Sequence, residues 1–161
     1  MNSKTINVVI SGLGGQGVIK ASDILAGAAF STGVDVKKSE IHGMSQRGGS
    51  VSSDVRFGSV VFSPMVPEGE ADYLLVFDST QIEVNRAMLA PAGVLIDPSS
   101  IDESRLSNKK NMNVALLGVL SRYLDFTLET WTDALQRNLP EAALEASRSA
   151  FMMGRSEGRS A

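Results

Sequence analysis

The sequence predicts an α/β fold, and three observations support this prediction. Short β-branched runs end in glycine-rich turns, segments with helical spacing lie between several of these runs, and the last third of the chain has helical spacing throughout. The order strand–helix–strand, hairpin, strand–helix–strand and helices indicates a Rossmann-like three-layer fold with a mostly parallel sheet, a β-hairpin after the second strand and C-terminal helices.

The first unit is predicted as strand, helix and strand. Residues 5–11, TINVVIS, form an apolar β-branched run that enters the turn GLGGQG. A helix is expected from Gly15 to about Ser31, and Gly33 should end it before a second strand at residues 34–39. Residues 5–39 are therefore interpreted as a βαβ unit. Four residues form the apolar stripe of its helix: Val18, Ala21, Leu25 and Ala28.

The middle of the chain alternates strand and loop signals. Residues 50–58 alternate apolar and polar side chains, and a hairpin is expected between them and residues 60–62. Two prolines and a glycine then predict a loop over residues 63–70. The remaining elements are predicted as a buried strand at 71–78, a helix around 81–89 and a strand at 94–97.

The C-terminal third is predicted to be helical. Apolar residues recur at helical intervals from Met112 to Tyr123, and Thr127 is a suitable N-cap for a helix with Leu128, Trp131 and Leu135 inward. Pro140 is expected in the first turn of a last helix that runs to about residue 153. One domain is expected over residues 1–153, followed by a disordered tail at 154–161.

Composition excludes several kinds of protein. The net charge of −3 argues against a nucleic-acid binder, and no apolar stretch is long enough to span a membrane. The N-terminus lacks the pattern of a signal peptide, so a cytoplasmic location is expected. The chain has no cysteine and one histidine, which leaves no disulfide, no thiolate zinc site and no cysteine-ligated iron–sulfur cluster.

The turn after the first strand is a candidate anion-binding loop. Gly12, Gly14 and Gly17 match G-x-G-x-x-G between a predicted strand and a helix start, which is the context of a Rossmann-like dinucleotide site. Glu40 follows Gly17 by 23 residues and is a candidate ribose-binding acid. Three interpretations remain open: a nucleotide site, a purely structural turn, and a site shared with a partner.

The second candidate segment is SEIHGMSQRGGS, residues 39–50. Because the two strands that precede the glycine-rich segments are predicted to be parallel, both segments should meet at one edge of the sheet. The second segment would bring polar side chains and flexible backbone to an anion- or polar-ligand-binding edge. Its candidate contributors are Glu40, His42, Ser45, Gln46, Arg47, Gly48 and Gly49.

Simpler interpretations of this segment also remain open. His42 is a candidate contact and not a predicted catalyst, Arg47 could pair with Glu40 or Asp54, and the two glycines could only turn the chain. The sequence has neither a G-x-S-x-G nucleophile elbow nor the G-x-x-x-x-G-K-[ST] loop of NTPases. No catalytic residue and no metal ligand are predicted on this chain.

Taken together, four segments resemble a known family. GLGGQGV, SEIHGMSQRGGSV, SPMVPEGEADYLLVFD and NVALLGVL are similar to the gamma subunit of thiamine-diphosphate-dependent 2-oxoacid:ferredoxin (acceptor) oxidoreductases. Within that family HGMSQRGGS most resembles the beta subunit of the indolepyruvate oxidoreductases. The resemblance is close over residues 7–97 and looser over 111–153.

The resemblance implies a role inside a multi-subunit enzyme that converts a 2-oxoacid, such as indolepyruvate, to an acyl-CoA and passes electrons to ferredoxin. Thiamine diphosphate and the iron–sulfur clusters are then expected on partner subunits, and coenzyme A as a ligand shared with them. The isolated chain is expected to be inactive and to expose a face through which it could form a homodimer. Ten positions match the family's two loops: Gly12, Gly14, Gly15, Gln16, Gly17, His42, Gln46, Arg47, Gly48 and Gly49.

One departure and two alternatives accompany this expectation. Residues 98–113 form a shorter segment than the resemblance implies, so the sheet edge is expected to be smaller or differently covered. The alternatives are a stand-alone NAD- or flavin-binding Rossmann-like protein and a scaffold whose loops make only subunit contacts.

Overall fold

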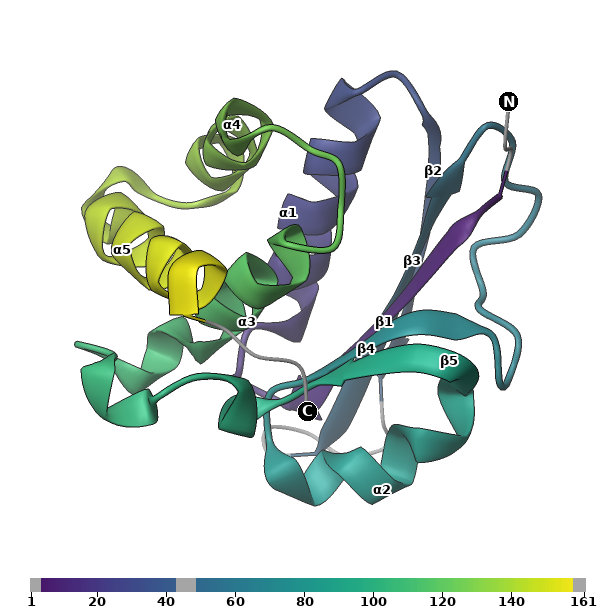
Figure 1. The fold of residues 1–161 in the computed structure, drawn as a ribbon, viewed down its shortest axis with the longest axis horizontal. Coiled ribbons are helices and arrows are strands. Elements are labelled where there is room, and N and C mark those ends of the chain that lie inside the picture. Colours follow the sequence, from purple (N-terminus) through teal and green to yellow (C-terminus); the bar gives the residue numbers. More distant parts are fainter. Residues whose placement is uncertain (1–3, 43–48, 158–161) are drawn as a thin grey trace.

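A five-stranded sheet with its long helices on one face makes up the fold (Figure 1). The computed structural model describes residues 4–42 and 49–157, and of His42 only the backbone. The α/β class is confirmed. The strands are β1 (Ile6–Leu13), β2 (Asp35–His42), β3 (Ser50–Gly58), β4 (Ala71–Val76) and β5 (Leu89–Ile96). The helices of four residues or more are α1 (Val18–Ser31), α2 (Ile82–Asn85), α3 (Met112–Ser121), α4 (Leu128–Asn138) and α5 (Glu141–Glu157).

The sheet is mixed, with the order β2-β3-β1-β4-β5. β4 pairs in parallel with β1 and β5, whereas β3 pairs antiparallel with β1 and β2. Four of the five strands therefore point the same way, and β3 runs against them. The expected βαβ unit is wrong in one respect: β1 and β2 are parallel in direction, but β3 lies between them. The carboxyl ends of β1, β2, β4 and β5 and the start of β3 share one edge of the sheet.

Alternation of apolar side chains along each strand divides them between two faces. On β1, Val8 and Ile10 belong to the large core under α1 and α3, and Val9 belongs to a small cluster on the opposite face. The predicted stripe of α1 is confirmed, because Val18, Ala21, Leu25 and Ala28 are all buried. α4 and α5 pack behind α1 and α3, on the same side of the sheet (Figure 1).

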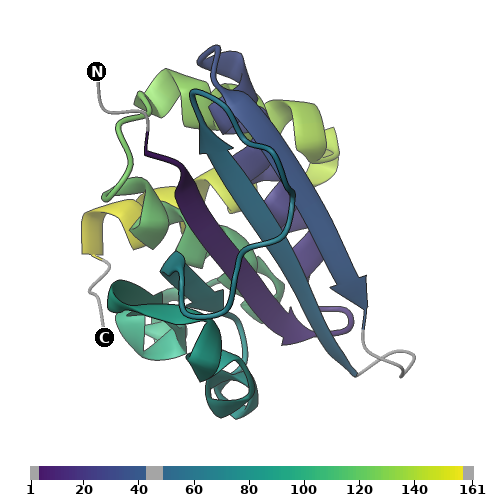
Figure 2. The ribbon, with the colours of Figure 1, turned by 90° about the vertical axis from the view of Figure 1, so that its right-hand side faces the viewer.

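The opposite face is covered by residues 59–70 and α2 rather than by long helices. Figure 2 shows this segment crossing the sheet after β3. The predicted strand at 60–62 is wrong, because β3 pairs with its two neighbouring strands instead. Side chains satisfy the backbone there: Asp35 accepts from Val61 N at 2.8 Å, and Arg56 donates to Ser63 O at 2.8 Å.

Asp54 fixes the middle of this segment from below. Its carboxylate is 2 % exposed and accepts a hydrogen bond from Val66 N at 2.9 Å. Burial raises the pKa of Asp54 above its ordinary value, although the bond from Val66 N and the charge of Arg56 act to lower that pKa. The segment is therefore attached to the sheet by a buried carboxylate, in addition to the apolar contacts of Val66.

The C-terminal helices agree with the sequence except at two places. Thr127 caps α4 by accepting from Thr130 N, as expected, and Trp131 and Leu135 are fully buried, but Leu128 is 39 % exposed. The last helix continues to Glu157, so the expected tail begins too early; residues 158–161 lie outside the described part of the chain. Gly154 explains the extension, because it is buried against α3.

Two glycines let α3 and α5 approach each other closely. A Cβ on Gly118 would lie 2.1 Å from Phe151 O, and one on Gly154 would lie 1.9 Å from Ala115 O. These contacts are with backbone, which cannot move aside as a flexible side chain can. The spacing of the two helices is therefore set by the absence of side chains at these positions.

We expect Gly118→Ala to destabilise the protein by about 1–3 kcal/mol, because the methyl group forces the two helices apart. Gly27→Ala, in α1, is the matched control. Its Cβ would meet only Nδ2 of Asn138, the last residue of α4, at the ordinary contact distance of 3.5 Å. The control should stabilise the protein by about 0.5–1 kcal/mol through higher helix propensity. Urea unfolding of both variants measures the difference, and equal stability of the two would contradict the close packing of α3 and α5.

Candidate functional site

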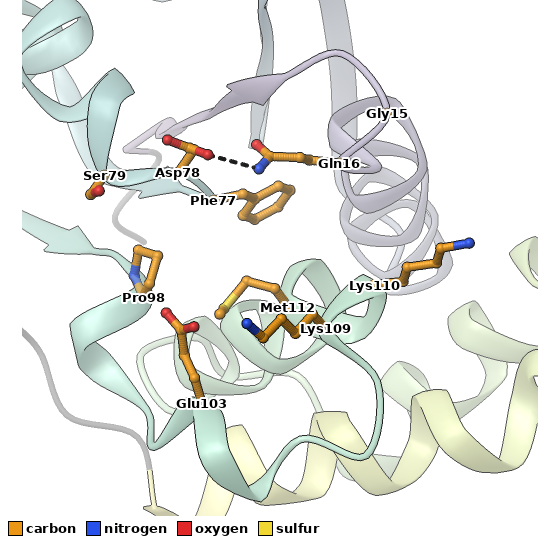
Figure 3. Close-up of a pocket in the computed structure, with 10 residues that line it drawn as sticks. All are labelled: Gly15, Gln16, Phe77, Asp78, Ser79, Pro98, Glu103, Lys109, Lys110 and Met112. Atoms are coloured by element: carbon orange, nitrogen blue, oxygen red, sulfur yellow. Dashed lines mark hydrogen bonds between the residues drawn. The ribbon is translucent and has the colours of Figure 1, made fainter. Parts of the chain in front are cut away.

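The candidate site lies at the edge of the sheet where β1, β4 and β5 end. A cavity of about 490 Å³ opens there, in the position where ligands bind in many open α/β sheets (Figure 3). Three loops contribute: residues 14–17 after β1, 77–79 after β4 and 98–112 after β5. The cavity is lined by Gly15, Gln16, Phe77, Asp78, Ser79, Pro98, Glu103, Lys109, Lys110 and Met112.

The turn after β1 depends on glycine at position 17. Gly17 is the N-cap of α1 with φ 78°, a left-handed conformation that side chains rarely adopt, and a Cβ there would lie 2.4 Å from Asn113 Nδ2. Asn113 in turn donates to Gly17 O at 3.3 Å, which joins the turn to α3. No side chain caps α1, so the positive end of this helix stays available to an anion.

Gln16 links the glycine turn to the end of β4. Its Oε1 accepts from Leu13 N at 2.7 Å, and its Nε2 donates to Asp78 Oδ2 at 3.0 Å (Figure 3). Both ends of the amide are therefore used to hold the turn. Gln16, which the sequence predicts as a site residue, lines the cavity, and these bonds make it a positioning residue for the loop.

Asp78 is held in its ionised form. Its Oδ1 accepts from the hydroxyl of Thr80 at 2.6 Å and from Thr80 N at 3.0 Å. These bonds, with the bond from Gln16, outweigh desolvation and lower the pKa of Asp78 below its ordinary value. A carboxylate that accepts three hydrogen bonds is a fixed structural anion and a poor proton donor near neutral pH.

The segment after β5 gives the cavity its cations. Residues 98–111 form three short 3₁₀ turns, and the last of them carries Lys109 and Lys110. In Figure 3 the Lys109 ammonium lies between Glu103 and Met112, and Lys110 extends toward the side of Gly15 and α1. The same cavity also carries the carboxylates of Asp78 and Glu103, so its cations and anions are balanced in number. The uncapped start of α1, which favours an anion, lines the neighbouring hollow with Lys20.

Sequence reasoning missed Glu103, Lys109 and Lys110, which were assigned only to a short connecting segment. A signal was present: a Lys-Lys pair lies between the end of a predicted strand and the start of a helix. Ligand-binding loops follow the carboxyl ends of strands in such sheets, so this pair belonged among the candidates.

The second candidate segment meets the glycine turn at its described end. Gly14 N donates to Gly49 O at 2.8 Å, which agrees with the expectation that the two segments share one edge. Ser45, Gln46, Arg47 and Gly48 lie outside the described residues, as does the side chain of His42. A second hollow of about 430 Å³ runs along the other side of the glycine turn, from Lys20 to Val51, next to this junction.

Glu40 lies apart from the glycine turn. It is on β2, and β3 separates that strand from β1, so the two strands are about 10 Å apart. Lys38 Nζ lies 2.5 Å from both Glu40 Oε1 and Asp23 Oδ1. Burial acts to lower the pKa of Lys38, but these carboxylates raise it above its ordinary value. The position expected of a ribose-binding acid, beside the first strand, is occupied by β3 instead.

No cluster of three or more His, Asp or Glu side chains suited to a metal ion occurs within residues 4–42 and 49–157. Over the same residues no helix is long and apolar enough to cross a membrane.

Comparison with known proteins identifies the family. Residues 7–157 match the family model described as pyruvate ferredoxin/flavodoxin oxidoreductase. The chain belongs to this family. It is 31 % identical over 191 aligned positions to the indolepyruvate oxidoreductase subunit IorB of Pyrococcus horikoshii, with 94 % of this chain and 95 % of that protein covered. The family resemblance read from the sequence is thereby confirmed.

Two solved structures share the fold. The gamma subunit of a keto/oxoacid ferredoxin oxidoreductase from Geobacter sulfurreducens superposes with a TM-score of 0.79 at 26 % identity, covering 94 % of this chain and 97 % of that one. The 2-oxoglutarate:ferredoxin oxidoreductase of Magnetococcus marinus, solved with 2-oxoglutarate, coenzyme A and succinyl-CoA bound, gives a TM-score of 0.82 at 19 % identity. The match covers 96 % of this chain but 31 % of the Magnetococcus chain, where the fold is one part of a longer polypeptide.

We expect Gln16→Glu to destabilise the protein by about 1–3 kcal/mol at pH 7, because a second carboxylate would face Asp78 where an amide now donates. In the wild type the pKa of Asp78 is lowered on folding, so its carboxylate stabilises the folded state at neutral pH. That stabilisation is lost only when the pH falls below the ordinary pKa of an aspartate. Like-charge repulsion in the variant raises the pKa of the pair, so the variant should regain stability as the pH falls from 7 to 4.5.

Urea unfolding at the two pH values measures this difference. Gln136→Glu, on the exposed side of α4, is the matched control and should track the wild type at both pH values. A Gln16→Glu variant with the same pH profile as the control would contradict the role assigned to the Gln16–Asp78 bond.

Proposed function

We propose that this chain is the gamma-type subunit of a 2-oxoacid:ferredoxin oxidoreductase and that its glycine-turn edge forms part of the coenzyme A and substrate region of the assembled enzyme. The observation that carries the proposal is the pair of hollows at that edge, one lined by Lys109 and Lys110 and the other by the uncapped start of α1, in a chain whose family uses ferredoxin or flavodoxin. Similarity to IorB supports indolepyruvate or a related aryl 2-oxoacid as the substrate.

The residues of this chain indicate which cofactors it could bind and which its partner subunits would bind. Without cysteine it offers no thiolate for an iron–sulfur cluster, so the clusters belong to partner subunits, as does thiamine diphosphate. Coenzyme A supplies the thiol that accepts the acyl group, and its phosphates are the anionic part that suits this cavity. Lys109, Lys110 and the start of α1 would hold those phosphates.

The candidate residues of the second segment join this site in the proposal. Ser45, Gln46, Arg47 and Gly48 lie between His42 at the end of β2 and Gly49, whose carbonyl bonds to the glycine turn. Ile41 and Val84, 44 % and 64 % exposed, flank the same edge and suit a partner's contact.

The stand-alone NAD- or flavin-binding alternative has less support. In such folds the ribose-binding acid ends the strand next to β1, and here that neighbour is the antiparallel β3. Calorimetry with NAD and with FMN on the isolated chain separates the two functions, because tight binding of either would favour the alternative.

We expect the isolated chain to be inactive with a 2-oxoacid, coenzyme A and thiamine diphosphate, and the complex with its neighbouring-gene subunits to be active. In that complex the double substitution Lys109→Gln/Lys110→Gln should raise KM for coenzyme A about three- to tenfold with little change in kcat, because it removes ground-state binding of phosphate. Arg137→Gln on α4 removes the same kind of charge far from the cavity and is the control. An unchanged KM would exclude the two lysines from the coenzyme A site.

We expect Arg47→Ala to lower turnover of the complex by at least about tenfold while leaving assembly intact. Guanidinium groups bind planar carboxylates and phosphates in two-pronged geometry, which alanine cannot replace. Size-exclusion chromatography reports assembly, and ferredoxin or viologen reduction reports turnover. Full turnover in the intact variant complex would instead favour the scaffold interpretation.

A further inference from the structure

The segment that crosses the second face of the sheet displays apolar side chains to solvent. Val60, Phe62 and Met65 are 54 %, 92 % and 53 % exposed, and they lie within six residues of one another. Phe62 is the most exposed large apolar side chain in the described part of the chain. Single exposed apolar residues are ordinary, but three on one short segment mark a surface that contacts another molecule.

This segment is held in place by side chains of the strands beneath it. Asp35 and Asp54 accept from Val61 N and Val66 N, at 2.8 Å and 2.9 Å, and Val61 and Val66 are 3 % and 4 % exposed. Val61 and Val66 are therefore buried as anchors, and Phe62 and Met65 between them are exposed.

Further bonds fix the carbonyl groups between these anchors. Arg56 donates to Ser63 O and Met65 O at 2.8 Å and 3.2 Å, and Asn7 Nδ2 donates to Glu70 O at 3.0 Å. The bond from Arg56 Nε to Asn7 Oδ1, at 2.8 Å, joins the two donors to each other. A loop fixed in this way loses little conformational freedom when it binds, which favours tight association.

The segment also carries charge of one sign. Glu68 and Glu70 are exposed, and residues 59–70 contain no lysine or arginine. Two lysines lie nearby, but each is paired with a carboxylate. Lys37, on β2, pairs with Asp35, and Lys4, just before β1, pairs with Asp72. The complementary surface is accordingly an apolar pocket with basic groups around it.

We propose, on the basis of the proposed function, that Phe62 on this segment is the anchor by which the chain docks onto the larger, thiamine-diphosphate-binding subunit of its oxidoreductase. In the Magnetococcus marinus enzyme the same fold is 31 % of one polypeptide, so there the neighbouring protein is joined covalently. A separate chain of this fold needs a noncovalent attachment in its place. Aromatic side chains are enriched at protein interfaces, and one that fills a partner's pocket can supply much of the binding energy.

A second copy of this chain fits the surface less well. A two-fold dimer with its axis at Phe62 would bring Glu68 and Glu70 of one copy close to the same residues of the other, and like charges repel. The projecting Phe62 ring fits a pocket on a different subunit better than it fits the same projecting surface on a second copy of this chain.

The test is the affinity of the full chain for the co-purified thiamine-diphosphate-binding subunit encoded beside it, measured by biolayer interferometry. We expect Phe62→Ser to weaken binding at least about tenfold, as removal of a central aromatic anchor does. Phe30→Ser is the matched control: Phe30 is 72 % exposed on α1, away from the segment, and its loss should change the affinity less than about twofold. Thermal unfolding of both variants should match the wild type, because neither ring is buried.

Each outcome decides the proposal. Wild-type affinity in Phe62→Ser would overturn it while leaving the proposed function intact. An equal loss in Phe30→Ser would also overturn it, since the effect would not be specific to the segment. A wild-type chain that does not bind the subunit would overturn this inference and the proposed function together. A wild-type homodimer that Phe62→Ser converts to a monomer, with subunit binding unchanged, would assign the surface to a second copy.

Discussion

The position of β3 between β1 and β2 is the constraint on which the rest of this structure depends. Because β3 runs antiparallel to both neighbours, it returns the chain to the edge where β1 and β2 end. β3 therefore begins beside the glycine turn, and Gly14 N donates to Gly49 O directly before that strand. The same insertion moves Glu40 one strand away from that turn. One change in strand order thus replaces a dinucleotide site with an edge that can be shared between chains.

The glycine turn is built to keep its shape without a ligand. Gly17 supplies the left-handed conformation, Asn113 holds it from α3, and Gln16 joins it to Asp78 after β4. Three separate parts of the chain therefore fix one short loop. The bonds of Gln16 and Asp78 are satisfied within the protein, which leaves Lys109, Lys110 and the uncapped end of α1 as the groups suited to an outside anion.

Two surfaces with different physical characters then face outward. The edge of the sheet is polar, glycine-rich and hollowed, as ligand sites are. The face crossed by residues 59–70 is apolar, rigidly fixed and acidic, as docking surfaces can be. We propose that both surfaces work together with a neighbouring chain, the first by sharing a ligand and the second by docking.

The sequence by itself determined the α/β class, the glycine turn, the buried stripe of α1 and the Thr127 cap, because each depends on local spacing or on one residue's conformational preference. It also carried the family, since two glycine-rich segments at a set separation are seldom shared by chance. Strand order was decided only by the tertiary structure. Residues 60–62 look like a strand, yet Val61 N donates to the side chain of Asp35, which is distant in sequence, and not to a neighbouring strand. The cations of the cavity were decided in the same way: only the folding of residues 98–111 beside the ends of β1 and β4 brings Lys109 to the glycine turn. Contacts between distant segments depend on the packing of the whole chain, and local patterns do not encode them.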